Sequence, residues 1–236
     1  MSPINIILIV FVFVLLYFIY RIYLYYSRNI VAQNAIYLQN GGVTIDATKI
    51  NKVSSTSSSI SIWVYLNSFN TSSTKQIFSI GGGVYTMYID STSPVLKFDV
   101  KMNSGIAPSS FVITNSFPIQ KWVNVFVNIN NNNVFEFYLN GKLVSTYSLN
   151  GGNVALISSS AGAGIQIGGS QQPPDIVVTN FIRWPKTTFA PDVWKNYLAG
   201  NGTSLFNYNA ALSVTQNDTI VNYMSLFNIS PNALTS

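Results

Sequence analysis

The chain has 236 residues with 12 basic and 7 acidic side chains, and it contains no cysteine and no histidine. Disulfides, thiolate or imidazole metal sites, and catalytic Cys–His or Ser–His pairs are therefore excluded. Charged residues make up 8% of the chain, against roughly 25% in ordinary soluble proteins. The basic residues form no run or stripe, so the sequence gives no support for nucleic-acid binding.

The N-terminal segment differs sharply from the rest. Residues 1–20 carry no charged side chain, and residues 6–20 are apolar or aromatic throughout. A helix of about 20 such residues is long enough to cross a hydrocarbon core of about 30 Å. A cleaved signal peptide would need a basic start and a small-residue cleavage site, and both are absent. We therefore expect a transmembrane anchor over residues 1–26 that contacts membrane lipid, followed by a short linker over residues 27–36.

The residues after the apolar run suit a membrane interface. Tyrosines are enriched there, and basic residues favour the cytosolic side. The predicted interface anchors are Arg21, Tyr23, Tyr25, Tyr26 and Arg28. Because no basic residue precedes the apolar run, this pattern predicts a single-pass protein whose C-terminal part lies in the cytosol.

Residues 37–236 are expected to form one β-rich head. Alternating apolar residues predict strands at Ser59–Leu66, Lys121–Asn130 and Val134–Leu139. Asn140-Gly141 is the favoured two-residue hairpin turn. About 200 residues suffice for one well-filled core.

Two segments near the C-terminus carry helix or hairpin signals. Pro191–Leu198 has an early proline, an acidic residue in its first turn and Gly200 beyond its end, so it predicts a helix. Ala210–Thr215 and Thr219–Phe227 fit a hairpin around Asn217-Asp218. The apolar spacing of the second segment also fits a helix, and both alternatives stay open here.

Four segments in register resemble a laminin-G-like or concanavalin A-like domain. Trp122–Val127 followed by Val134–Val144 resembles a Trp-led strand and a hairpin with a Tyr-x-Asn-Gly turn; Ile165–Gly169, Ile176–Trp184 with Phe189–Tyr197, and Ser61–Val64 continue the match. The resemblance implies an all-β fold, an antiparallel jelly-roll sandwich of the concanavalin A-like type. With the anchor, the architecture is also similar to membrane-linked minor capsid proteins of large icosahedral DNA viruses.

The sequence offers little for catalysis, cofactors or metals. Some relatives of this fold hydrolyse glycans with paired carboxylates, but Glu136 is the single glutamate here and the aspartates are far apart. Asp90 and Asp175 occupy plausible loop positions for calcium, although turn formation accounts for both. We expect no enzyme activity, no cofactor and no metal site.

Two functions remain open. The first is a structural minor capsid protein in a virion, linking an internal viral membrane to other proteins of the shell. The apolar tail from Asn207 to Ser236 would supply part of its docking surface. The alternative is a membrane-tethered lectin or adhesin that binds glycans, with Trp184 as a possible ligand contact.

Overall fold

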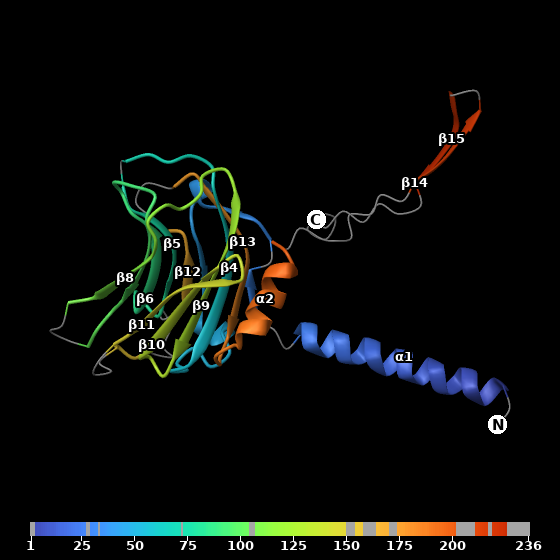
Figure 1. Ribbon diagram of the computed structural model, residues 1–236, viewed down its shortest axis with the longest axis horizontal. Coiled ribbons are helices and arrows are strands. Elements are labelled where there is room, and N and C mark those ends of the chain that lie inside the picture. The colour runs from blue at the N-terminus through green and yellow to red at the C-terminus, as the bar shows by residue number, and fades with distance from the viewer. Residues whose placement is uncertain are drawn as a thin grey trace. The chain divides into compact units, whose positions relative to one another are not determined.

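The computed structural model describes residues 3–26, 29–32, 34–71, 73–103, 107–149, 154–157, 164–169, 174–201, 211–216 and 219–225. The chain divides into two compact units, residues 1–201 and residues 202–236. Each is considered by itself, and the larger unit holds a sandwich of two β-sheets (Figure 1).

The N-terminal helix α1 spans Pro3–Tyr26. The large apolar side chains of residues 8–20 are between 40% and 68% exposed. Within the part of the chain that the structure describes, no helix has the length and apolar character that a membrane crossing requires. The expectation of a transmembrane anchor over residues 1–26 is therefore not supported.

Seven strands form the first sheet, called sheet A. Their order is β1-β13-β4-β9-β10-β11, and β2 also pairs with β13. The bounds are β1 Asn29–Ala32, β2 Ile36–Tyr37, β4 Ser58–Leu66, β9 Trp122–Asn130, β10 Val134–Leu139, β11 Lys142–Ser148 and β13 Ile176–Trp184. All of these pairs are antiparallel. β1 lies inside the segment expected to be a linker, so part of that segment belongs to the sheet.

Six strands form sheet B, in the order β3-β12-β5-β6-β7-β8. The bounds are β3 Val43–Ile45, β5 Lys75–Ile80, β6 Tyr85–Ile89, β7 Leu96–Val100, β8 Ser109–Thr114 and β12 Ile165–Ile167. Two short 3-10 helices, Leu38–Asn40 and Ala47–Lys49, flank β3. The predicted antiparallel sandwich with jelly-roll character is confirmed.

The core fills the space between the two sheets. Alternating residues of each strand point inward, as expected when one face of a strand is buried. Phe135 and Phe137 of sheet A meet Phe98 and Phe111 of sheet B, with ring centroids 5.3 to 6.2 Å apart. Offset and edge-on aromatic pairs at such distances add to the stability given by burial alone.

Helix α2, Ala190–Leu198, covers the outer face of sheet A (Figure 1). Its Val193 is fully buried in a small cluster with Phe126 and Tyr138. Tyr197 stacks on Trp63 of β4, with ring centroids 5.7 Å apart. Pro191 lies in the first turn, where its missing N–H costs no hydrogen bond. The helix expected over residues 191–198 is confirmed.

Two local expectations from the sequence are also settled. Asn140 and Gly141 both have positive φ, 50° and 76°, and join β10 to β11 as a tight hairpin turn. In the C-terminal unit, β14 (Ala211–Gln216) pairs antiparallel with β15 (Thr219–Ser225). This part of the tail is thus a hairpin and not a helix.

Candidate functional site

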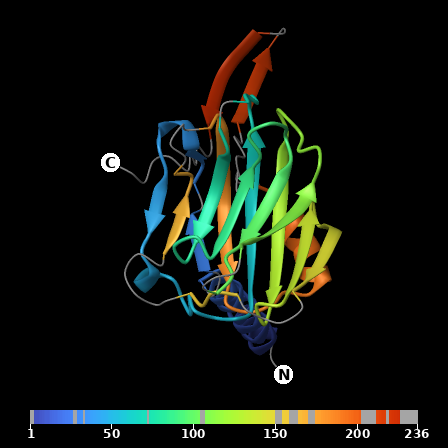
Figure 2. The ribbon, with the colours of Figure 1, turned by 90° about the vertical axis from the view of Figure 1, so that its left-hand side faces the viewer.

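The outer face of sheet B carries a row of polar residues. Cross-strand pairing aligns Gln166, Ser79, Thr86, Asp99 and Ser110 from β12, β5, β6, β7 and β8. Their sequence neighbours point into the core because strand residues alternate between faces. Figure 2 shows this sheet toward the viewer. The row therefore runs across the strands on the side of the sandwich opposite to α2.

A second set of paired residues lies next to this row. Gln76 of β5 pairs with Tyr88 of β6, which pairs with Lys97 of β7. Lys97 forms an ion pair with Asp90, which directly follows β6. Gln76 donates from Nε2 to the carbonyl oxygen of Gly168, 2.7 Å away. These contacts fix the side chains that surround Tyr88.

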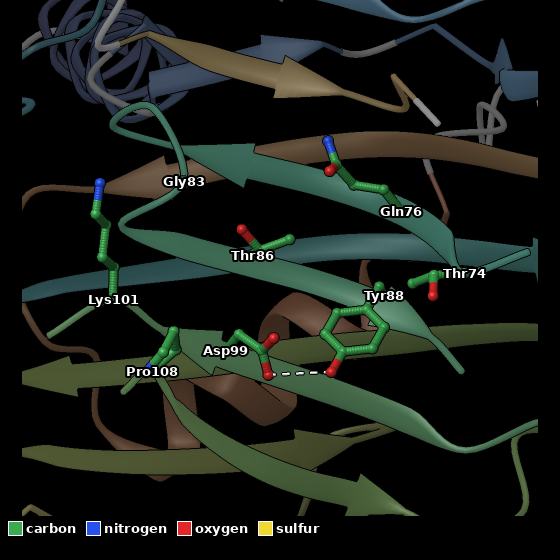
Figure 3. A pocket seen from close by; sticks show the side chains of 8 residues that line it. All are labelled: Thr74, Gln76, Gly83, Thr86, Tyr88, Asp99, Lys101 and Pro108. Carbon is green, nitrogen blue, oxygen red and sulfur yellow. Dashed lines mark hydrogen bonds between the residues drawn. The ribbon is translucent and has the colours of Figure 1, made fainter. Parts of the chain in front are cut away.

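These rows border a hollow of about 440 Å³. Six of its eight lining residues have polar side chains; the eight are Thr74, Gln76, Gly83, Thr86, Tyr88, Asp99, Lys101 and Pro108. Figure 3 shows Tyr88 and Asp99 in the lining, with Lys101 and Gly83 at one end and Gln76 and Thr74 at the other. Small-molecule sites usually have volumes of about 300–1,000 Å³ and a few well-placed polar groups.

A hydrogen bond orders the centre of the hollow. The hydroxyl of Tyr88 donates to Oδ1 of Asp99 over 3.1 Å (Figure 3). Burial is the main cause that raises the pKa of Tyr88, and the Asp99 carboxylate raises it further. The phenol therefore stays protonated at neutral pH and holds Asp99 in place. Asp99 can then accept hydrogen bonds from hydroxyl groups, and the tyrosine ring adds an apolar surface.

The acidic residues named from the sequence serve structural contacts. Oε2 of Glu136 accepts from Asn128 at 3.1 Å and from Tyr138 at 3.0 Å, on the outer face of sheet A. It shares that face with Tyr138, as the strand alternation predicts. Burial, and after it the hydrogen bond to Glu136, raises the pKa of Tyr138 to about 12.

The two candidate calcium ligands lie in separate turns. Asp90 accepts from Lys97 and Thr92, and the Lys97 hydrogen bond is the main cause that lowers its pKa. Asp175 accepts from Asn67 and Ser68. Among the described residues, no three His, Cys, Asp or Glu side chains are close enough to hold a metal ion.

Trp184, the possible ligand contact named from the sequence, lies away from the hollow. Trp184 stacks on Phe126 with ring centroids 5.6 Å apart, beside the cluster under α2. Arg21, Tyr23, Tyr25 and Tyr26 fall in the last turns of α1; Arg28 lies outside the described residues.

The residues of the hollow were not singled out from the sequence. Residues 85–89 and 96–100 alternate buried and half-buried side chains, and this alternation is visible in the sequence as Tyr-Thr-Met-Tyr-Ile and Leu-Lys-Phe-Asp-Val. That signal marks Thr86, Tyr88 and Asp99 as outward residues. Their alignment depends on strand pairing, which the alternation alone does not give.

Several solved structures have a similar fold. The Botulinum neurotoxin serotype D ligand binding domain, in complex with N-acetylneuraminic acid, matches with a TM-score of 0.57 and 15% identity, over 70% of this chain and 42% of that chain. The binding domain of Paraclostridial Mosquitocidal Protein 1 matches with a TM-score of 0.54 and 12% identity, over 69% and 42%. The binding domain of Botulinum neurotoxin DC, in complex with rat synaptotagmin II, matches with a TM-score of 0.52 and 19% identity, over 67% of this chain and 39% of that chain.

These identities show a shared fold and nothing more specific, and this chain spans about two fifths of each of those chains. A search of curated proteins gave no match. A family model described as the Concanavalin A-like lectin/glucanases superfamily matches residues 39–178, which is more than half of the chain. The chain therefore belongs to the concanavalin A-like lectin/glucanase superfamily.

Proposed function

We propose that this protein is a non-enzymatic glycan-binding domain whose ligand binds on the outer face of sheet B. The observation that carries this proposal is the hollow ordered by the Tyr88–Asp99 hydrogen bond. Its lining supplies acceptors, donors and one aromatic ring, which is the chemistry that sugar hydroxyls and ring faces require. Membership of a superfamily that includes lectins supports the same reading, as does a structural neighbour solved with N-acetylneuraminic acid.

The same lining argues for binding without hydrolysis. A glycosidase needs two carboxyl groups about 5–10 Å apart. Asp99 is the single carboxylate among the eight residues that line the hollow. Glu136 lies on the outer face of the other sheet, where its carboxylate is hydrogen-bonded to Asn128 and Tyr138. A lectin uses Asp99 as an acceptor and needs no second acid.

The test is glycan-array screening followed by calorimetry with the glycan that binds best. We expect Asp99→Asn to weaken binding at least about tenfold, because a charged acceptor contributes roughly 1.5–3 kcal/mol in a hydrogen bond. Tyr88→Phe should weaken it less, because it removes the hydroxyl and keeps the ring. Asp192→Asn on α2, far from sheet B, is the matched control and should bind like wild type. Equal affinity in all three variants would contradict the proposed site.

Calcium is expected to have no role in this binding. Asp90 and Asp175, the candidate ligands, are engaged in separate turns by neighbouring side chains. Chelation should therefore leave both the melting temperature and the glycan affinity unchanged. A metal that bound the native state would raise the melting temperature, and the rise would grow with the metal concentration. A calcium-dependent rise of several degrees would contradict this expectation.

The proposed location of the protein is a membrane surface, with α1 as the attachment. The exposed apolar side chains of residues 8–20 support this. Glycosylation of the sequons at Asn70, Asn201, Asn217 and Asn228 would report the side of the membrane on which the head lies. Glycosylation at Asn70, an exposed loop residue, would place the head outside, where a lectin meets glycans. Unmodified sequons would agree with the cytosolic side that the arginine distribution favours.

The minor capsid role gains no support from the fold or from the similar structures. We therefore propose the lectin function instead of the capsid function.

A further inference from the structure

The outer face of sheet A carries exposed apolar side chains around α2. Phe189, Trp194 and Leu198 are 80%, 40% and 60% exposed, and Leu143 of β11 is 55% exposed. Trp194 and Leu198 are four residues apart, so they lie on one face of the helix. We call these four residues the α2 patch. Large apolar side chains gathered on one exposed face mark an interaction surface.

Contacts beneath the patch join α2 to the strands of sheet A. A side-chain carbon at Gly141 would lie 2.6 Å from Cε3 of Trp194, so the β10–β11 turn touches the helix directly. Leu143 pairs with Tyr138, whose ring packs against Phe126 below α2. At the other end of the helix, Thr188 is held to the sheet by Asn128, and Phe189 follows it. The helix is therefore in contact with the β10–β11 hairpin near Trp194 and bonded to β9 just before Phe189.

The charges around the patch are mainly basic. Lys142 follows Gly141, Lys186 lies in the loop before α2, and Lys195 lies on the helix; all three are exposed. Asp192 pairs with Lys195 over 3.2 Å. Glu136, the other acid on this face, accepts two hydrogen bonds from neighbouring side chains. Exposed aromatic side chains beside lysines with long flexible stems suit the boundary between lipid acyl chains and anionic headgroups.

We infer that the α2 patch rests on an anionic lipid surface. Phe189, Trp194 and Leu198 enter the interface, and Lys142 and Lys186 reach the headgroups. Since α2 covers sheet A, the hollow on sheet B then faces away from the bilayer, toward its ligand. A protein partner or a second copy would also cover apolar side chains. The basic rim favours lipid, because the chain has little acidic surface with which another copy could complement it.

The absence of cysteine in the chain makes a site-specific test possible. The full-length protein would carry an environment-sensitive fluorophore at Leu198→Cys, with Thr44→Cys on β3 of sheet B as the control position. Phosphatidylcholine vesicles with and without phosphatidylserine are the probe. We expect the label at residue 198 to shift to shorter wavelength and to be quenched by brominated acyl chains. The shift should be larger with phosphatidylserine, and the label at residue 44 should show none.

A second variant pair separates the patch from general apolarity. Phe189→Ser in the Leu198→Cys background should abolish the shift, whereas Leu156→Ser, which alters a leucine that is 74% exposed in another loop, should keep it. Four results would overturn the inference. The label at residue 198 could stay in water while the protein floats with the vesicles through α1 alone. It could be shielded without lipid in a concentration-dependent way, which indicates a second copy. The labels at residues 198 and 44 could shift by the same amount. The label at residue 198 could also shift by the same amount on vesicles with and without phosphatidylserine.

Discussion

Replacing Arg183 by methionine is expected to lower the free energy of unfolding by about 1–3 kcal/mol. The guanidinium is 1% exposed. It donates to the carbonyl oxygens of Asn51, Lys52 and Val53 over 3.0, 3.2 and 3.2 Å. Burial lowers its pKa to about 10, so the group remains charged at neutral pH. Methionine fills similar space but leaves three carbonyls without these donors, and that of Val53 is buried. An orphaned buried acceptor is costly.

Urea unfolding followed by tryptophan fluorescence measures this change. Lys186→Met is the matched control, since Lys186 is an exposed basic residue three positions away. Substitutions at such sites usually change stability by less than about 0.5 kcal/mol. Arg183→Lys should fall between the two, because one ammonium cannot reach all three carbonyls with the fixed geometry of a guanidinium. A loss below about 1 kcal/mol for Arg183→Met would show that the loop of residues 51–53 does not depend on this side chain.

Deleting residues 1–26 is expected to change the solubility of the protein completely. Thirteen consecutive side chains, residues 8–20, are large, apolar and exposed. Transfer of each methylene group from water to an apolar environment is favourable by about 0.8 kcal/mol. The full-length chain should therefore partition into detergent or float with vesicles. The shortened chain should remain in the aqueous phase and keep its β-sheet circular dichroism.

The cut site matters for the interpretation of this deletion. β1 begins at Asn29 and pairs with β13 through Asn29↔Arg183 and Ile30↔Ile182, so a deletion that ends at residue 26 leaves the sheet intact. Extending the deletion to residue 36 removes β1 and should lower the melting temperature. If the full-length chain stays in the aqueous phase, then another surface covers the apolar side chains of α1, and the proposed membrane attachment is wrong.

Local chemistry in the sequence determined most elements of sheet A and the helix above it. The alternating run around Trp122–Asn130 became β9, the Asn140-Gly141 pair became a turn with two positive φ angles, and the proline-led segment became α2. Each of these depends on a side-chain period or on a backbone preference within a few residues. Such signals need no knowledge of distant parts of the chain.

Only the tertiary structure decided the candidate site. Thr86 and Asp99 are 13 positions apart and Ser79 and Gln166 are 87 apart in the sequence, yet strand pairing places them in one row. The same holds for Arg183, whose partners lie about 130 residues earlier. It also holds for Asn29–Ala32, which gains its strand conformation from β13. A binding surface on a sheet is set by pairing order and register, and these depend on contacts between segments that local patterns do not connect.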